Sequence, residues 1–170
     1  MWTIYESPFG RLTVVGSSNG LTELHFPGRG GPFEEADRDD LVLSDAVDQL
    51  TEYFDGTRTA FDLRVNVVGT PFQRTVWQQL DEIPYGTTIN YSELAQAIER
   101  PDRLRAAAGA VGRTPIPIII PCHRVIGANG DLTGYLGGLQ RKQALLDLEA
   151  RVSRREPLPS GWQTRQLPLI

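Results

Sequence analysis

The 170-residue sequence is poor in reactive and metal-binding side chains, with one cysteine, one lysine and two histidines. A single cysteine cannot form a disulfide within the chain, which is typical of a reducing, cytoplasmic setting. No apolar run approaches the roughly 18 residues of a membrane-spanning helix, and the N-terminus lacks the basic and apolar segments of a signal peptide. One cysteine and two histidines cannot supply the four ligands of a structural zinc site. We therefore expect a cytoplasmic protein without metal, cofactor or membrane partner.

The charge is unevenly distributed along the chain. The net charge of −4 and the pI near 5.2 argue at first against a nucleic-acid partner. However, residues 1–68 carry a net charge of −7 and residues 69–170 carry +3. Sixteen of the seventeen basic residues are arginine, which suits bidentate contacts with phosphates and bases, although a GC-rich genome would produce the same bias. The asymmetry predicts two units with different electrostatic roles.

The first 68 residues predict a small antiparallel sheet with one helix. Short β-type segments at 3–6, 11–15 and 21–26 are separated by turn residues, including an Asn19-Gly20 pair typical of hairpins. Ser44 is expected to cap a helix that places Val47, Leu50 and Phe54 on one face. Alternating apolar residues at 61–68 predict a returning strand. Residues 27–40 are rich in glycine, proline and acids and indicate a loop.

The remainder predicts a mostly helical domain over 69–156 and a tail over 157–170 in which Trp162 is a candidate anchor. Thr70 and Gln73 have the spacing of a capping box, and Asn90 and Glu93 repeat it. The second helix and a third, over about 102–111, are separated by a short break, as in a helix-turn-helix. The third helix is rich in alanine at 106–110, which favours either close approach to a partner surface or burial against a neighbouring helix.

The chemistry of the sequence is concentrated around Cys122. The apolar run 116–120 predicts a buried extended segment that ends beside this cysteine. A lone cysteine is more often a buried apolar residue than a nucleophile. Here His123 and Arg124 follow directly, and such groups lower a thiol pKa. Because adjacent side chains rarely bond directly, a relay from Cys122 to His123 is expected to pass through water.

Glu149 is the candidate to orient the imidazole. We expect it in the last turn of a helix over 139–150, where the helix dipole disfavours an anion by about 0.3–1 kcal/mol. The alternative is that Glu149 pairs with Arg151 or Arg154 at the surface. The other histidine, His25, lies in a predicted strand and is expected to have a structural or solvated role.

The motif Pro121-Cys122-His123-Arg124-Val125, followed by Gly134-Tyr135-Leu136-Gly137-Gly138-Leu139, closely resembles the O6-alkylguanine-DNA alkyltransferases (methylated-DNA–protein-cysteine methyltransferases). The resemblance covers about residues 70–150. It implies an α+β protein with a ribonuclease H-like first domain and a winged-helix-like second domain. It also implies DNA repair by irreversible, single-use transfer of an alkyl group from O6-alkylguanine, and also from O4-alkylthymine, to the cysteine after base flipping. The expected partner is double-stranded DNA, bound through its minor groove by a monomer.

The resemblance also implies roles for individual residues. Cys122 would accept the alkyl group, His123 would be the water-mediated base, and Glu149 would polarise it. The implied substrate and DNA contacts are Tyr91 and Ser92 at the start of the second helix, Arg105 as the residue that fills the gap left by the flipped base, the carbonyls of Cys122 and Val125, and the pocket loop Tyr135, Leu136 and Gly137.

Two residues depart from the family pattern. Thr114 stands where asparagine is common and offers fewer hydrogen bonds to the adjoining turn. Leu136 stands where serine or another small residue is common, so its bulk is expected to alter tolerance for large O6 groups. Two other functions remain open at this point: a non-catalytic protein that binds alkylated bases or regulates transcription, and a thiol hydrolase that uses Cys122 and His123.

Overall fold

The structure is a computed structural model in which residues 1–158 are described. A three-stranded antiparallel sheet has the order β1-β2-β3, formed by β1 (Trp2–Ser7), β2 (Gly10–Ser17) and β3 (Gly20–His25). Its hairpin turns fall where the sequence predicts them: Gly10 and Gly20 both have positive φ, which glycine adopts without steric cost. Leu12, Val14, Leu21 and Leu24 are buried. The three predicted strands are thus confirmed.

Helix α1 (Ser44–Phe54) forms as predicted, but Ser44 does not cap it. The residue before the helix is Leu43, and the Ser44 hydroxyl donates to the Leu41 carbonyl at 2.8 Å. The chain forms a turn just before the helix, at residues 39–42, where the Asp39 carboxylate accepts hydrogen bonds from the amides of Leu41 and Val42. The prediction that Ser44 caps the helix is therefore wrong. The amides of the turn before the helix are bonded by Asp39 instead.

The strand predicted over 61–68 is also wrong. Only Val65 forms a bridge, parallel to Leu21, supported by bonds from the Leu21 amide to Arg64 and from the Asn66 amide to Leu21. Phe61, Leu63 and Val67 are partly buried against the core. The alternating pattern correctly reported burial of one face, but it carried no information about hydrogen-bonding partners.

The C-terminal part is mostly helical. It contains α2 (Pro71–Asp81), α3 (Tyr91–Ala97), α4 (Leu104–Val111) and α5 (Leu139–Ser153), with the two-residue strands β4 (Ile89–Asn90) and β5 (Val125–Ile126) paired in parallel. Both predicted capping boxes are present, at Thr70 with Gln73 and at Asn90 with Glu93. Helices α3 and α4 pack together across the 3₁₀ turn Pro101–Arg103, as a helix-turn-helix requires.

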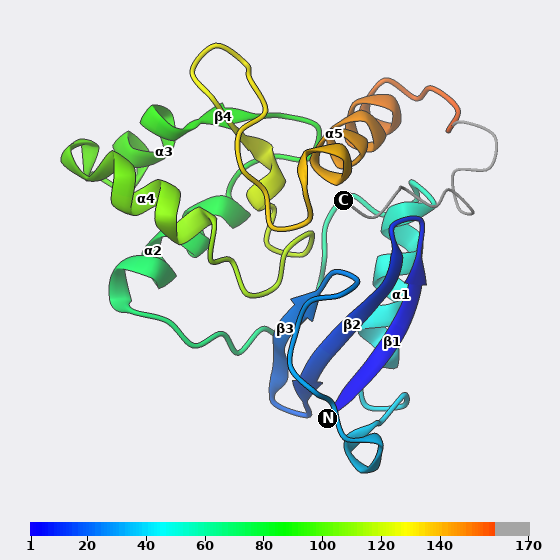
Figure 1. Ribbon diagram of the computed structural model, residues 1–170. Helices are drawn as coiled ribbons and strands as arrows, with labels where there is room; N and C mark the ends of the chain where they lie inside the picture. The colour runs from blue at the N-terminus through cyan, green and yellow to red at the C-terminus, as the bar shows by residue number, and fades with distance from the viewer. Residues whose placement is uncertain (159–170) are drawn as a thin grey trace.

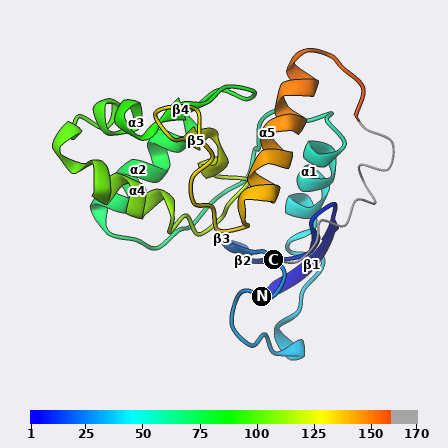
Figure 2. The same ribbon diagram turned by 45° about the horizontal axis from the view of Figure 1, so that its top comes forward.

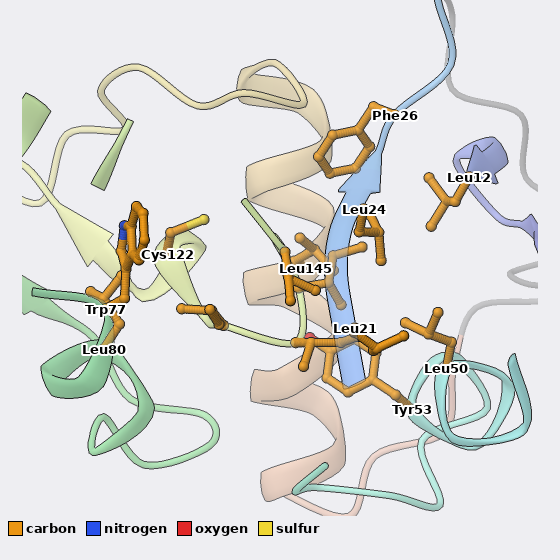
Figure 3. Close-up of a cluster of buried hydrophobic side chains, with 14 of the residues drawn as sticks. Leu12, Leu21, Leu24, Phe26, Leu50, Tyr53, Trp77, Leu80, Cys122 and Leu145 are labelled. Atoms are coloured by element: carbon orange, nitrogen blue, oxygen red, sulfur yellow. The ribbon is translucent and has the colours of Figure 1, made fainter. Parts of the chain in front are cut away.

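Helix α5 occupies the centre of the molecule. It lies beside α1, with α2, α3 and α4 gathered on its other side (Figures 1 and 2). Leu145 of α5 lies close to Leu21 and Leu24 of β3, and Tyr53 reaches from α1 toward α5 (Figure 3). The buried apolar residues form one cluster that runs from the sheet to Trp77 and Cys122. Both parts of the chain therefore share a core that passes through α5.

No helix among residues 1–158 is long and apolar enough to cross a membrane. The predicted tail falls outside the described residues from position 159 onward, and this includes Trp162.

Candidate active site

Cys122 begins a 3₁₀ turn, Cys122–Arg124, directly after Pro121. The preceding run 116–120 is buried as predicted, but it is not extended. Ile118 has a φ of +78°, and the Ile120 amide donates to the Ile116 carbonyl at 2.9 Å, so the run folds into a tight turn. A β-branched residue in this region of φ is strained. The turn places the Cys122 side chain inside the core, where the residue is only 2% exposed.

His123 and Glu149 form a fully buried pair. The His123 Nε2 lies 2.7 Å from Glu149 Oε1, and burial lowers the pKa of His123 below its usual 6.5. An ionised carboxylate can only accept, so Nε2 carries the hydrogen and Nδ1 is left as an acceptor. The structure shows no partner for Nδ1. This is the tautomer needed for a base that receives a proton at Nδ1.

The sequence predicted that Glu149 lies in the last turn of its helix, and this prediction is wrong. Helix α5 continues to Ser153, so Glu149 lies one turn inside it, and its 1% exposure excludes a surface pair with Arg151 or Arg154. The dipole argument for Glu149 was therefore wrong. What holds the carboxylate there is a set of hydrogen bonds from distant segments.

Arg124 is a second partner of Glu149, a role that the sequence did not predict. Its Nε and Nη2 atoms donate to the carboxylate at 2.9–3.2 Å, its Nη1 donates to the Ile83 carbonyl at 2.7 Å, and the residue is 7% exposed. Burial alone would raise the pKa of Glu149, but the hydrogen bonds from His123 and Arg124 and the positive charge of Arg124 outweigh it and hold the pKa at about 2. The carboxylate is therefore ionised at neutral pH.

Two further donors complete the shell around Glu149. The Tyr53 hydroxyl of α1 donates to Oε1 at 2.8 Å, and the Gly86 amide donates to Oε2 at 3.1 Å. Tyr53 is fully buried and comes from the N-terminal part (Figure 3). The N-terminal part thus contributes a hydrogen bond to the site. Nothing in the local sequence around Tyr53 signals this contact, since 96 residues separate the partners.

Burial raises the pKa of the Cys122 thiol to about 11, which overturns the expectation that its neighbours lower it. The charge of Arg124 is balanced by the carboxylate of Glu149, and His123 is neutral. Neither residue therefore supplies an unbalanced positive charge to the thiol. The groups that oppose burial are a hydrogen bond with Thr114 and the charge of Lys142. Deprotonation of Cys122 therefore requires a proton acceptor, not simple ionisation at neutral pH.

Lys142 is, like Tyr53, a residue near the site that the sequence analysis did not predict. It is the one lysine of the sequence, it is 1% exposed, and its Nζ donates to the carbonyls of Val125 at 2.6 Å and Thr133 at 3.0 Å. Among the described residues no carboxylate pairs with it. Its one available signal was composition, because it is the single lysine of the sequence.

A cavity of about 450 Å³ includes three of the expected substrate residues in its lining, but among the described residues that line it Cys122 is not included. Tyr91, Tyr135 and Leu136 line it together with Arg29 and Thr133. Gly137 packs directly behind, where a Cβ would come within 2.8 Å of the Phe26 ring, so glycine lets the loop approach β3. Ser92 and Arg105 lie outside the lining and are exposed at the starts of α3 and α4. No three metal-binding side chains converge anywhere in residues 1–158.

A thiol beside a neutral imidazole and a buried carboxylate, joined to a helix-turn-helix, defines a class of DNA-binding proteins that use a cysteine nucleophile. Comparison with known families identifies the family within this class. Residues 71–151 match the DNA-binding domain of 6-O-methylguanine DNA methyltransferase, and residues 1–67 match its ribonuclease-like domain. The chain belongs to the 6-O-methylguanine DNA methyltransferase family.

Individual relatives agree with this assignment. The chain is 47% identical over 154 residues to the methylated-DNA–protein-cysteine methyltransferase of Mycolicibacterium paratuberculosis, covering 87% of this chain and 91% of the relative. It is 42% identical to the inducible enzyme of that name from Bacillus subtilis, covering 93% and 90%. Among solved structures, Mycobacterium tuberculosis OGT in complex with DNA superposes with a TM-score of 0.81 at 44% identity, covering 92% and 94%.

Proposed function

We propose that the protein repairs DNA by moving the alkyl group of O6-alkylguanine onto Cys122. The observation that carries the proposal is the Cys122–His123–Glu149 cluster: the residue that follows the buried thiol is bonded to Glu149 through Nε2, and its Nδ1 has no partner among residues 1–158. DNA repair by alkyl transfer is also the activity of the family. A purely DNA-binding role does not account for this cluster, and a hydrolase does not account for the helix-turn-helix.

The proposed reaction is one displacement. The Cys122 thiol passes its proton through a water molecule to His123 Nδ1, and the imidazolium is stabilised by Glu149. The thiolate attacks the alkyl carbon, the carbon–oxygen bond breaks, and the bond's electron pair remains with the guanine O6. A proton returned to the purine completes the product, with Tyr91 as its hydrogen-bond partner. The thioether has no facile leaving group, so each molecule reacts once.

We propose that the base is extruded from the helix before it reacts, because O6 is inaccessible within stacked DNA. Arg105 would fill the vacated space, Ser92 would contact the backbone, and the small side chains of α4 would approach the minor groove. The carbonyls of Cys122 and Val125 would read the guanine amine. Each already accepts one internal hydrogen bond and has a second lone pair for this contact.

The finer properties are proposals as well. We infer domains at 1–68 and 69–156, a monomer that binds DNA through the minor groove, additional transfer from O4-alkylthymine, and a cytoplasmic location that keeps the lone thiol reduced. Tyr135 and Gly137 would close the pocket over the flipped base.

Intact-mass measurement tests the central proposal. After incubation with excess O6-methylguanine duplex, the protein is expected to gain one methyl group and no more, and peptide mapping should place it on Cys122. Cys122→Ser should gain none. Removal of many methyl groups per protein molecule would contradict single-use transfer, and an unmodified wild-type protein would favour a binding role.

Leu136 is expected to restrict the size of the transferred group. It lines the cavity of about 450 Å³ that Tyr91 and Tyr135 also line, which we call the lesion cavity, and it also lines a second cavity on the other side, so it lies at the boundary of the two. Leu136→Ser should raise the benzyl-to-methyl ratio of transfer rates by about tenfold, since a few buried carbons are worth about 1–3 kcal/mol. Single-turnover rates with both substrates provide the measurement. An unchanged ratio would show that the Leu136 side chain does not limit the pocket.

A further inference from the structure

A second cavity, of about 460 Å³, opens between the two parts of the chain. One wall is β3 and the loop after it, and the other is the segment that follows α4. We call it the interdomain groove. The residues that line it are Thr22, Glu23, Leu24, His25, Phe26, Arg29, Gly30, Val68, Gly112, Arg113, Thr114, Pro115, Pro117 and Leu136.

The groove carries arginines that lack counter-ions. Arg29 lies on its N-terminal wall and Arg113 on its C-terminal wall, and neither forms an ion pair among the described residues. Arg113 makes only a long bond, 3.4 Å, to the Gly109 carbonyl. The groove has one acid, Glu23, whose carboxylate is bonded to His25 at 2.7 Å. The walls are therefore electropositive despite the −7 charge of residues 1–68.

A third guanidinium lies close behind the wall. Arg141 is 9% exposed and stands over the ring of Phe26, 5.5 Å from its centroid. It donates to the carbonyls of Gly137 and Phe9, no carboxylate pairs with it in the described part of the chain, and its buried Nε has no partner. Burial lowers the pKa of Arg141, and the positive charge of Arg29 also lowers it. Such a cluster favours an anion.

The interdomain groove is continuous with the lesion cavity. Arg29, Gly112 and Leu136 line both spaces. An anion held by Arg29 would therefore lie next to whatever occupies the lesion cavity. On a DNA strand whose base has entered that cavity, the neighbouring anions are phosphodiesters.

We propose that the interdomain groove binds the DNA phosphodiester backbone beside the extruded nucleotide, with Arg29 and Arg113 as its phosphate contacts. The N-terminal part thus takes part in DNA binding, at the one place where its acidic surface presents an unpaired arginine to the lesion cavity. Guanidinium groups suit this role because they bind phosphate oxygens in pairs. The inference rests on the proposed DNA substrate and adds a contact from outside the helix-turn-helix.

The test compares Arg29→Gln with Arg64→Gln in the full-length protein. Arg64 is an exposed arginine of the same part, also without an ion pair in the described residues, and its backbone bonds to the opposite end of β3. Affinity for a lesion-containing duplex is measured at about 50 to 200 mM salt. Arg29→Gln should reduce the slope of log K against log salt by about one and weaken binding several-fold, because one phosphate contact is lost. Arg64→Gln should change neither.

The outcomes are separable. Equal effects of the two substitutions, or no effect of Arg29→Gln, would overturn the proposal. Competition by inorganic phosphate with an unchanged salt slope would make the groove a free-anion site and would overturn it equally. Arg64→Gln should still gain one methyl group at saturating DNA, as the wild-type protein does. Failure of the wild-type protein to be methylated would refute the proposed function and not the contact.

Discussion

Replacing Glu149 with alanine is expected to lower the free energy of unfolding by about 3–5 kcal/mol and to slow alkyl transfer at least about 100-fold. The substitution leaves the Arg124 guanidinium buried without its anion and removes the acceptor of Tyr53 and the Gly86 amide. It also deprives a protonated His123 of its counter-charge. Urea unfolding measures the first effect, and single-turnover transfer at saturating DNA measures the second.

A surface pair provides the matched control. Glu156 lies 3.8 Å from Arg154, with side chains 44% and 68% exposed, so Glu156→Ala should change stability by less than about 0.5 kcal/mol. Wild-type stability in Glu149→Ala would show that Arg124 does not depend on the carboxylate. A stable variant with unimpaired transfer would remove Glu149 from the mechanism.

Low pH should remove the contribution of Glu149 to the free energy of unfolding. Its folded pKa of about 2 is below the ordinary 4.5, so the folded state binds fewer protons than the unfolded state in this interval. The stabilisation is complete above pH 4.5 and declines as the pH falls toward 2. The stability difference between wild type and Glu149→Ala should therefore narrow across that window. A constant difference would mean that the carboxylate is not ionised in the fold.

Lys142→Met is expected to slow transfer at neutral pH by at least about tenfold, with recovery as the pH rises. Burial already raises the pKa of the Cys122 thiol to about 11, and the Lys142 charge opposes this rise. Removing the cation raises the pKa further and leaves less thiolate at pH 7. Methionine keeps the apolar stem and the approximate volume, while the carbonyls of Val125 and Thr133 lose a donor.

The pH–rate profile separates an electrostatic role from a structural one. An electrostatic role moves the profile to higher pH, whereas mere loosening of the pocket lowers the rate equally at every pH. Lys142→Arg retains the charge and should preserve the profile even if its rate falls. A profile for Lys142→Met parallel to that of the wild type would exclude Lys142 as a stabiliser of the thiolate.

Sequence reasoning was most successful where structure depends on neighbouring residues. The capping boxes at Thr70 and Asn90 and the turn glycines Gly10 and Gly20 act within a few positions, and all appear where the pattern predicts. It failed at 61–68 and at 116–120. In both, an apolar pattern predicted burial correctly, but the backbone conformation depended on segments distant in the chain.

The sequence by itself indicated the family, because the five-residue motif around Cys122 is specific to it, and it predicted Cys122, His123 and Glu149 as the residues of the site. Its single cysteine also directed attention to Cys122. Tertiary structure alone decided that Arg124 neutralises Glu149, that Tyr53 crosses from the first part of the chain, that the thiol is held protonated, and that Arg29 faces the lesion cavity. The physical reason is that burial and Coulomb interactions depend on distance in space, and these partners are separated by 25 to 96 residues along the chain.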